Sequence, residues 1–189
     1  MKRLSFILVL VAFAFSVNAQ KIGAYIKAGA NLGKIDGQSF EQNFNLAYHA
    51  GVAVEIGLTK KIGLQPEVYF SQTQTKVTNS TGNLTPNKDA QLNYLSIPLL
   101  LKINAGKYVA FHFGPEYGIL MNKDSSLVSN GKQAVKNGNF SFIGGLQFNL
   151  GAAKIYGRYN IGLTNISDLS NTGDWKTQQI QIGLAYSIF

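Results

Sequence analysis

The sequence has no cysteine, only two histidines and one tryptophan, and few charged residues for its length. Without cysteine the chain has no disulfide and no thiol nucleophile, so its stability must come from burial and hydrogen bonding. His49 and His112 alone do not make a multi-histidine metal site. We therefore expect no cofactor, no metal and no thiol-dependent catalysis.

Long apolar runs are also missing. After residue 19 no stretch approaches the roughly 20 apolar residues that a membrane-spanning helix needs, which excludes a helical membrane protein. Charged residues make up only 14% of the sequence, fewer than a water-exposed surface normally carries. Something other than water is expected to cover part of this protein.

Residues 1–19 have the three parts of a secretory signal peptide: a basic start, an apolar run over 4–17 and small residues at 17–19. The run is too short to span a membrane as a helix. We expect this segment to be removed, leaving 20–189 as one domain.

The formal charge of +8 falls to +6 when Lys2 and Arg3 are removed with this segment. The remaining basic residues are spread through turns and loops and form no continuous patch. This distribution, together with export, argues against binding of nucleic acid.

Apolar and polar residues alternate along the rest of the chain. In RYNIGLTNI, residues 158–166, every second residue is apolar, and arginine, asparagine and glycine occupy the other face. Such alternation predicts a β-strand with two chemically opposite faces. The same pattern predicts strands at 22–33, 46–58, 62–73, 93–103, 108–121, 139–150, 158–166 and 178–189.

The connections between these strands alternate in length. The short ones are TKK, NAGK and GAAK, and the long ones are 33–45, 74–91, 122–138 and 165–175. Short turns at one rim and long loops at the other are typical of a membrane β-barrel, and each strand is long enough to span a bilayer. We predict an all-β, eight-stranded, antiparallel, up-and-down transmembrane β-barrel.

A secreted soluble lipid-binding barrel would show the same alternation, with its apolar face inside. The polar face, however, is rich in glycine, which weakens a solvent-facing strand but fits a narrow lumen. Aromatic residues of the apolar face also fall into two groups, as membrane-interface girdles do. Toward the long loops lie Tyr48, Phe70, Phe140 and Phe142, and toward the short turns lie Phe111, Phe148 and Tyr186. We expect the apolar face to be outside.

Five charged residues then point into the lumen at similar depths: Lys27, Glu55, Glu67, Glu116 and Arg158. Because an uncompensated charge in so narrow a space is costly, we expect them to pair with one another as a salt-bridged plug. A narrow porin-like channel for small solutes is the alternative interpretation.

His49 and Ser71 are candidate neighbours across adjacent strands near the long-loop rim. Serine and histidine at that height would suit a lipid-modifying enzyme, but no orienting carboxylate is evident. We expect His49 to be a hydrogen-bonded lumen residue and the protein not to be an enzyme.

The segments LQPEVYFSQ, NYLSIPLLLK and RYNIGLTNI, with a last strand ending in AYSIF, resemble the PorT family of outer-membrane β-barrels over about residues 21–189. The resemblance implies a small exported barrel in the cell outer membrane, in a family with some members linked to protein secretion. It supplies no catalytic residues.

Two features depart from a regular barrel. Phe189 resembles the C-terminal aromatic residue that the outer-membrane assembly machinery often recognises. It falls on the inward-facing parity, however, one step out of phase with the lipid-facing Tyr186 and Ile188. Pro66, Pro98 and Pro115 lie inside strands, where we expect bulges or a weakened seam.

The sequence thus predicts a non-catalytic protein of envelope structure, surface interaction or accessory work for secretion. The alternatives are the narrow channel, a rim-sited lipid-modifying enzyme and a secreted soluble lipid-binding barrel. The expected partners of the monomer are outer-membrane lipid, the barrel assembly machinery during insertion, and a protein bound at the extracellular loops.

Overall fold

The computed structural model describes residues 22–36, 44–78, 84–123, 138–165 and 176–188. The predictions for the signal peptide and for Phe189 fall outside these residues. Within them, no helix is long and apolar enough to cross a membrane.

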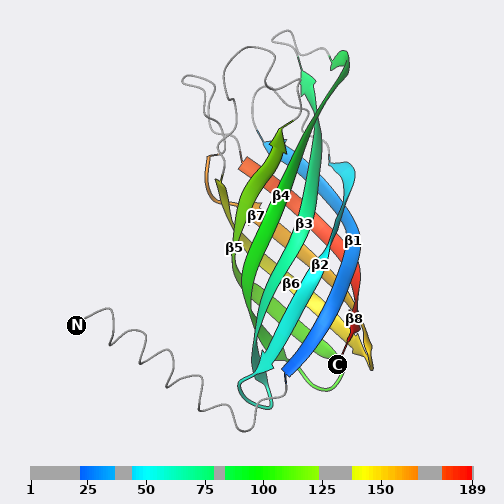
Figure 1. Cartoon of the computed structure of the whole chain (residues 1–189), viewed down its shortest axis with the longest axis vertical. Coiled ribbons are helices and arrows are strands. Elements are labelled where there is room, and N and C mark those ends of the chain that lie inside the picture. The colour runs from blue at the N-terminus through cyan, green and yellow to red at the C-terminus, as the bar shows by residue number, and fades with distance from the viewer. Residues whose placement is uncertain (1–21, 37–43, 79–83, 124–137, 166–175, 189) are drawn as a thin grey trace, which may run out of the picture.

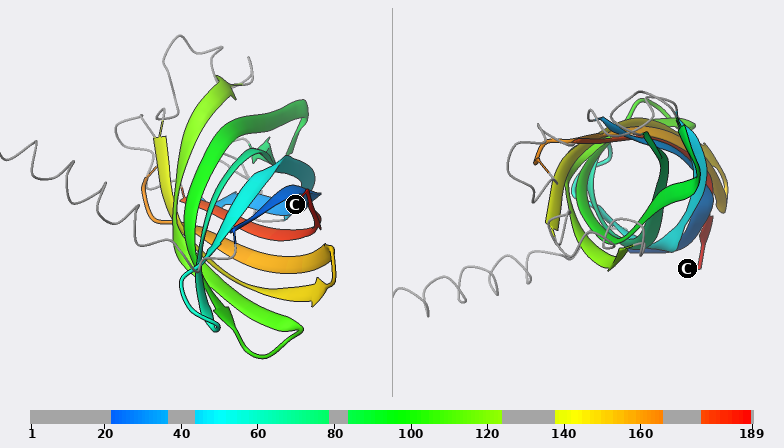
Figure 2. Two further views of the ribbon diagram at one scale, coloured as in Figure 1. Left: turned by 60° about the horizontal axis from the view of Figure 1, so that its bottom comes forward. Right: turned by 90° about the horizontal axis from the view of Figure 1, so that it is seen from above.

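Eight antiparallel strands form one closed barrel in which each strand pairs with its neighbours in sequence (Figure 1). They are β1 (Ile22–Asp36), β2 (Asn45–Gly57), β3 (Ile62–Thr78), β4 (Leu84–Asn104), β5 (Val109–Lys123), β6 (Gly138–Leu150), β7 (Ala153–Gly162) and β8 (Lys176–Ser187). Pairing of β1 with β8, from Tyr25 opposite Ser187 to Asp36 opposite Lys176, closes the ring that Figure 2 shows from above. The predicted fold class is confirmed.

Three tight turns lie at one end of the barrel, which we call the short-turn end. The Leu58 N–H donates to the Ile62 carbonyl at 2.9 Å, and the Ala105 N–H donates to the Val109 carbonyl at 2.9 Å. Gly106 and Gly151 have φ angles of 103° and 71°, which glycine adopts at little cost. The opposite end, where the longer connections leave the strands, is the long-loop end.

The apolar face of the strands points outward. On β8 the exposed fraction is 56% for Ile182 and 62% for Leu184, but 0% for Gln181, which faces the lumen. A continuous apolar belt of this kind cannot be covered by water at acceptable cost, whereas acyl chains cover it well. The predicted orientation is confirmed, and the soluble barrel with an apolar interior is wrong.

Strands β3 and β4 are longer than predicted. Their ladder runs on through Thr75 opposite Ala90 to Thr78 opposite Leu84, with a register shift between Lys76 and Thr78. The prediction of a loop is therefore wrong for residues 74–78 and 84–91, and residues 79–83 lie outside the described part of the chain. This stretch is polar but carries β-branched residues, which favour the extended backbone. Figure 1 shows the two strands rising beyond the rest of the barrel.

Each of the three prolines that the sequence places inside strands pairs with the strand that follows its own: Pro66 with Leu99, Pro98 with Glu116 and Pro115 with Phe142. Toward the preceding strand the ladder breaks at the proline and resumes in the same register, because proline has no N–H to donate there. The expected bulges at these prolines are wrong, and the interrupted seams fit the weakened-seam alternative. The second register shift lies elsewhere, between Asn93 and Tyr94.

Candidate functional site

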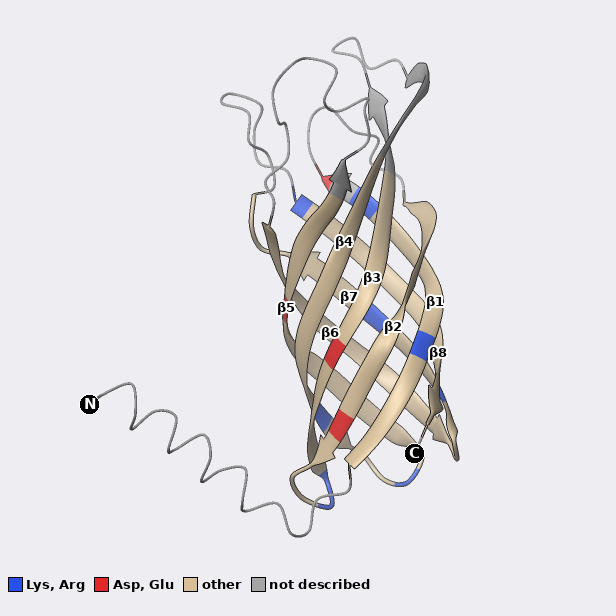
Figure 3. Cartoon of the chain, viewed as in Figure 1, with Lys and Arg blue, Asp and Glu red and all other residues tan. Residues whose placement is uncertain are grey.

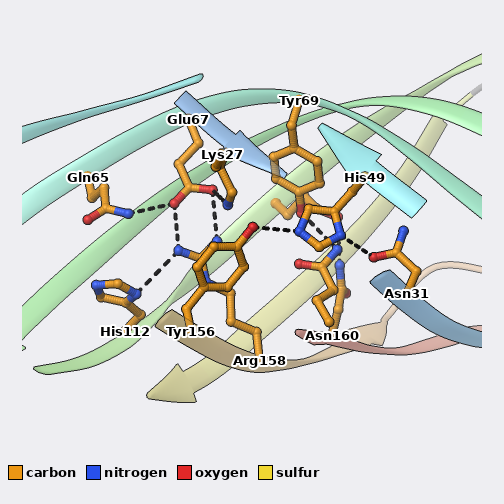
Figure 4. Close-up of polar contacts among 12 residues, drawn as sticks. Lys27, Asn31, His49, Gln65, Glu67, Tyr69, His112, Tyr156, Arg158 and Asn160 are labelled. Atoms are coloured by element: carbon orange, nitrogen blue, oxygen red, sulfur yellow. Dashed lines mark hydrogen bonds and ion pairs between the residues drawn. The ribbon is translucent and has the colours of Figure 1, made fainter. Parts of the chain in front are cut away.

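An ionic cluster occupies the middle of the lumen, where three strands converge on Glu67 of β3 (Figure 4). Lys27 of β1 donates to Glu67 Oε2 at 2.5 Å, and Arg158 of β7 donates to Oε2 at 2.8 Å and to Oε1 at 2.7 Å. All three side chains are buried, with exposed fractions of 1% or less. A two-pronged arginine contact of this kind fixes geometry as well as charge.

Two tyrosine rings surround this cluster. The Lys27 ammonium lies 4.7 Å from the ring centroid of Tyr69 and 4.6 Å from that of Tyr156. The Arg158 guanidinium carbon lies 4.7 Å from the Tyr156 centroid. These aromatic faces attract the two cations and fill the space that the ions leave. The middle of the barrel is therefore packed with side chains, as expected for an eight-stranded barrel.

Glycines on the inward face make room for the rings. A Cβ added at Gly51 would lie 2.2 Å from the Val68 carbonyl oxygen and 2.3 Å from Tyr69 Cβ. One added at Gly183 would lie 2.5 Å from the Tyr156 hydroxyl. The glycine-rich polar face noted in the sequence thus has a steric reason.

Glu55 lies near the short-turn end, apart from the central cluster. It accepts hydrogen bonds from Lys102 of β4 and from Lys154 of β7, each at 2.6 Å. The Lys154 ammonium also lies 3.5 Å from the Tyr25 ring centroid. The prediction that Glu55 pairs with Lys27 or Arg158 is wrong, because Glu55 is only two residues from the end of β2 and lies at another depth.

Lys102 and Lys154 were missed by the sequence reasoning, although a signal for each was present. Lys102 shares the inward parity of β4, which the apolar Leu100 obscured, and Leu100 itself is buried in the lumen. Lys154 was assigned to the GAAK turn, whereas β7 already begins at Ala153. Figure 3 shows the acidic and basic positions along the strands.

Glu116 of β5 has no basic partner among the described residues. Its carboxylate accepts hydrogen bonds from the Tyr69 hydroxyl, from Asn160 Nδ2 at 2.7 Å and from Ser141 Oγ at 3.2 Å. The single plug of two bases and three acids is therefore corrected to two separate ion clusters and one carboxylate held by neutral donors. Register around the barrel, which alternation does not specify, decides these partners.

His49 and Ser71 do face each other in the β2–β3 ladder, but both are buried in the lumen. His49 Nδ1 lies 2.6 Å from Asn31 Oδ1, and Nε2 lies 2.6 Å from the Tyr156 hydroxyl. An amide oxygen only accepts, so Nδ1 carries the proton and the tyrosine donates to Nε2. Ser71 donates instead to Gln179 Oε1 at 3.3 Å. The histidine is not placed as a base for the serine.

His112, the other histidine, accepts a hydrogen bond on Nδ1 from Arg158 Nη2 at 3.3 Å. Among the described residues, no group of three or more histidine, aspartate and glutamate side chains could hold a metal ion. The lumen thus combines fixed charges, buried amides and aromatic rings without an evident reactive centre in its described part.

Solved structures of outer-membrane barrels share this fold at low sequence identity. Ail, the attachment invasion locus protein of Yersinia pestis, solved in complex with the heparin analogue sucrose octasulfate, is 15% identical with a TM-score of 0.53, and the alignment covers 89% of this chain and 99% of Ail. Neisserial surface protein A is 9% identical with a TM-score of 0.55, covering 87% and 97%. OprG of Pseudomonas aeruginosa is 12% identical with a TM-score of 0.55, covering 88% and 95%. At these identities the likeness concerns the fold alone.

No curated protein matches the chain. The family model for the outer membrane protein beta-barrel domain, in contrast, matches residues 5–187, nearly the whole sequence. The outward apolar belt, the enclosed polar lumen and the closed ring of eight strands agree with that match. The chain belongs to the outer membrane protein beta-barrel domain family.

Proposed function

We propose that this protein is a non-catalytic outer-membrane barrel whose lumen is closed and whose work is done at the membrane surface. The observation that carries the proposal is the central cluster of Lys27, Glu67 and Arg158, which the rings of Tyr69 and Tyr156 complete. Breaking or moving such a buried, fully paired cluster to admit a solute would be costly.

A surface role follows from what remains outside the closed lumen. At the long-loop end, β3 and β4 extend beyond the other strands, and we expect this end to face the extracellular side. Names such as attachment invasion locus protein and surface protein indicate that related barrels work at the cell surface. Contact of these loops with a partner protein, or a purely structural role in the envelope, fits this arrangement.

An accessory role in protein secretion is a finer proposal. It depends on the resemblance of LQPEVYFSQ, NYLSIPLLLK and RYNIGLTNI to the PorT family. We also propose that the mature chain begins at Gln20, that the barrel assembly machinery inserts it as a monomer, and that it has no enzymatic activity.

Conductance across a planar lipid bilayer tests the closed lumen. We expect no unitary current steps from the wild-type protein, and steps from a Tyr69→Ala, Tyr156→Ala double variant, because both rings that fill the middle are removed. Ile182→Ala, a change on the outer face, is the matched control and should stay silent. Regular steps from the wild type would contradict the proposal and support the narrow porin-like channel.

A further inference from the structure

A polar cavity of about 20 Å³ lies in the lumen toward the long-loop end. Its lining includes Ser96, Glu116, Asn139, Thr177 and Gln179. Asn139 and Thr177 are each the second residue of a strand that follows a long connection, which places the cavity on the long-loop side. This volume accommodates about one particle of the size of a water molecule.

Among the described residues that line the cavity, Glu116 is the only one with a carboxylate, and none is a lysine, arginine or histidine. The four ion pairs of the described residues all involve Glu55 or Glu67, so the Glu116 carboxylate has no cation within ion-pair distance there. Its three hydrogen-bond donors are neutral. Burying a carboxylate without an opposite charge is unfavourable, so a cation bound beside Glu116 would stabilise its charged form.

Tyr94 supplies an independent observation at the same cavity. Its side chain lines the cavity, the residue is 5% exposed, and its buried hydroxyl has no hydrogen-bond partner in the described part of the chain. Buried hydroxyls are nearly always satisfied, so an unpartnered one calls for an explanation. A ligand that is coordinated by oxygen atoms would satisfy both the Tyr94 hydroxyl and the Glu116 carboxylate.

We propose that this cavity binds one small monovalent cation, of the sodium, potassium or ammonium class, between Glu116 and Tyr94. A single carboxylate balances a single positive charge, and the surrounding hydroxyl and amide oxygens are the ligands that hard cations prefer. Calcium would need six to eight oxygen ligands, commonly including several carboxylates, and the cavity offers one. The site does not depend on the surface role, because a closed barrel keeps that role with or without the ion.

The test is equilibrium unfolding by urea of the full-length mature barrel in lipid vesicles. NaCl, KCl or NH₄Cl replaces choline chloride at constant ionic strength, since choline is too large for the cavity. For one site that exists only in the folded state, the folding equilibrium constant rises about tenfold for each tenfold rise in cation concentration above the dissociation constant. A plot of the logarithm of the folding equilibrium constant against the logarithm of the cation concentration then has a slope of about one.

Glu116→Gln keeps the shape of the side chain but removes its negative charge. We expect this variant to abolish the dependence of folding on cation concentration. Tyr94→Phe keeps the ring, so it should fold, and should shift the onset of the slope to higher cation concentration. Glu55→Gln removes a carboxylate at the other end and should leave the slope unchanged. A wild-type slope of zero, as for a cavity holding only water, would overturn the proposal. So would an unchanged slope in Glu116→Gln or an unchanged onset of the slope in Tyr94→Phe.

Discussion

One carboxylate, that of Glu67, balances two buried cations at the centre of the barrel. Replacing it with glutamine leaves Lys27 and Arg158 close together with no counter-charge. We expect Glu67→Gln to lower the free energy of unfolding by about 3–5 kcal/mol, as the loss of one partner of a buried ion pair does. Urea unfolding in lipid vesicles measures this change.

Glu55→Gln is the control for that experiment. Its side chain is 18% exposed, so water near the short-turn end screens the two lysines that it would leave behind. The loss should therefore be smaller than for Glu67→Gln. Equal losses in the two variants would show that depth in the lumen does not set the cost.

Gly51, a glycine of the lumen, leaves no room for a larger side chain. Gly51→Ala places a methyl group against the backbone of Val68 and the Cβ of Tyr69, so we expect little or no folded barrel. Gly144→Ala on the outer face meets nothing within 4 Å and should fold as the wild type does. The heat-dependent mobility of the folded barrel on a gel reports the folded fraction. Normal folding of Gly51→Ala would contradict the packed lumen.

Some of the site could be read from the sequence at this scale. Parity correctly placed Lys27, Glu55, Glu67, Glu116 and Arg158 on the inner wall. It could not choose their partners, because a pair such as Glu67 and Arg158 joins strands that are not neighbours. Which side chains meet across the lumen depends on strand tilt and stagger, which a pattern within one strand does not contain.

At the scale of the strand, prolines lie where ladder bonds are already interrupted. Pro98→Ala adds an N–H and backbone freedom without changing register, so we expect a loss of only about 0.4–1 kcal/mol in the free energy of unfolding. Ile182→Pro, in contrast, falls where β8 is paired with both Ala30 and Gly157, and should prevent folding.

Urea unfolding of Pro98→Ala and the gel-shift assay on Ile182→Pro check these outcomes. A folding defect in Pro98→Ala as severe as that of Ile182→Pro would mean that the interrupted seam is needed for assembly.

Strand existence was predictable because alternation of two chemically opposite faces is a strong signal over ten or more residues. The ends of the strands were less predictable. Residues 74–78 and 84–91 lie beyond the apolar belt, where no membrane demands an apolar outer face. Their polar sequence therefore resembles a loop, although β3 and β4 continue there. Pro66, Pro98 and Pro115 show the reverse case, since they suggest bulges but leave the register unchanged.

For the whole molecule, the face that each strand turns outward decides whether lipid or water covers the barrel. Composition alone predicts that the polar face is inside. Small residues on that face fit a narrow interior, and the low charge content disfavours a water-covered surface. The specific role could not be predicted in the same way, because one barrel scaffold serves many functions through its loops.

The absence of native cysteine permits a direct measurement of that orientation. Single cysteines at Ile182 and at Gln181, which are 56% and 0% exposed, are treated with a maleimide fluorophore in vesicles of brominated lipid. We predict that the cysteine at 182, once labelled, is strongly quenched by the brominated acyl chains, whereas the cysteine at 181 reacts only after unfolding. Quenching at 181 with a protected cysteine at 182 would contradict the account.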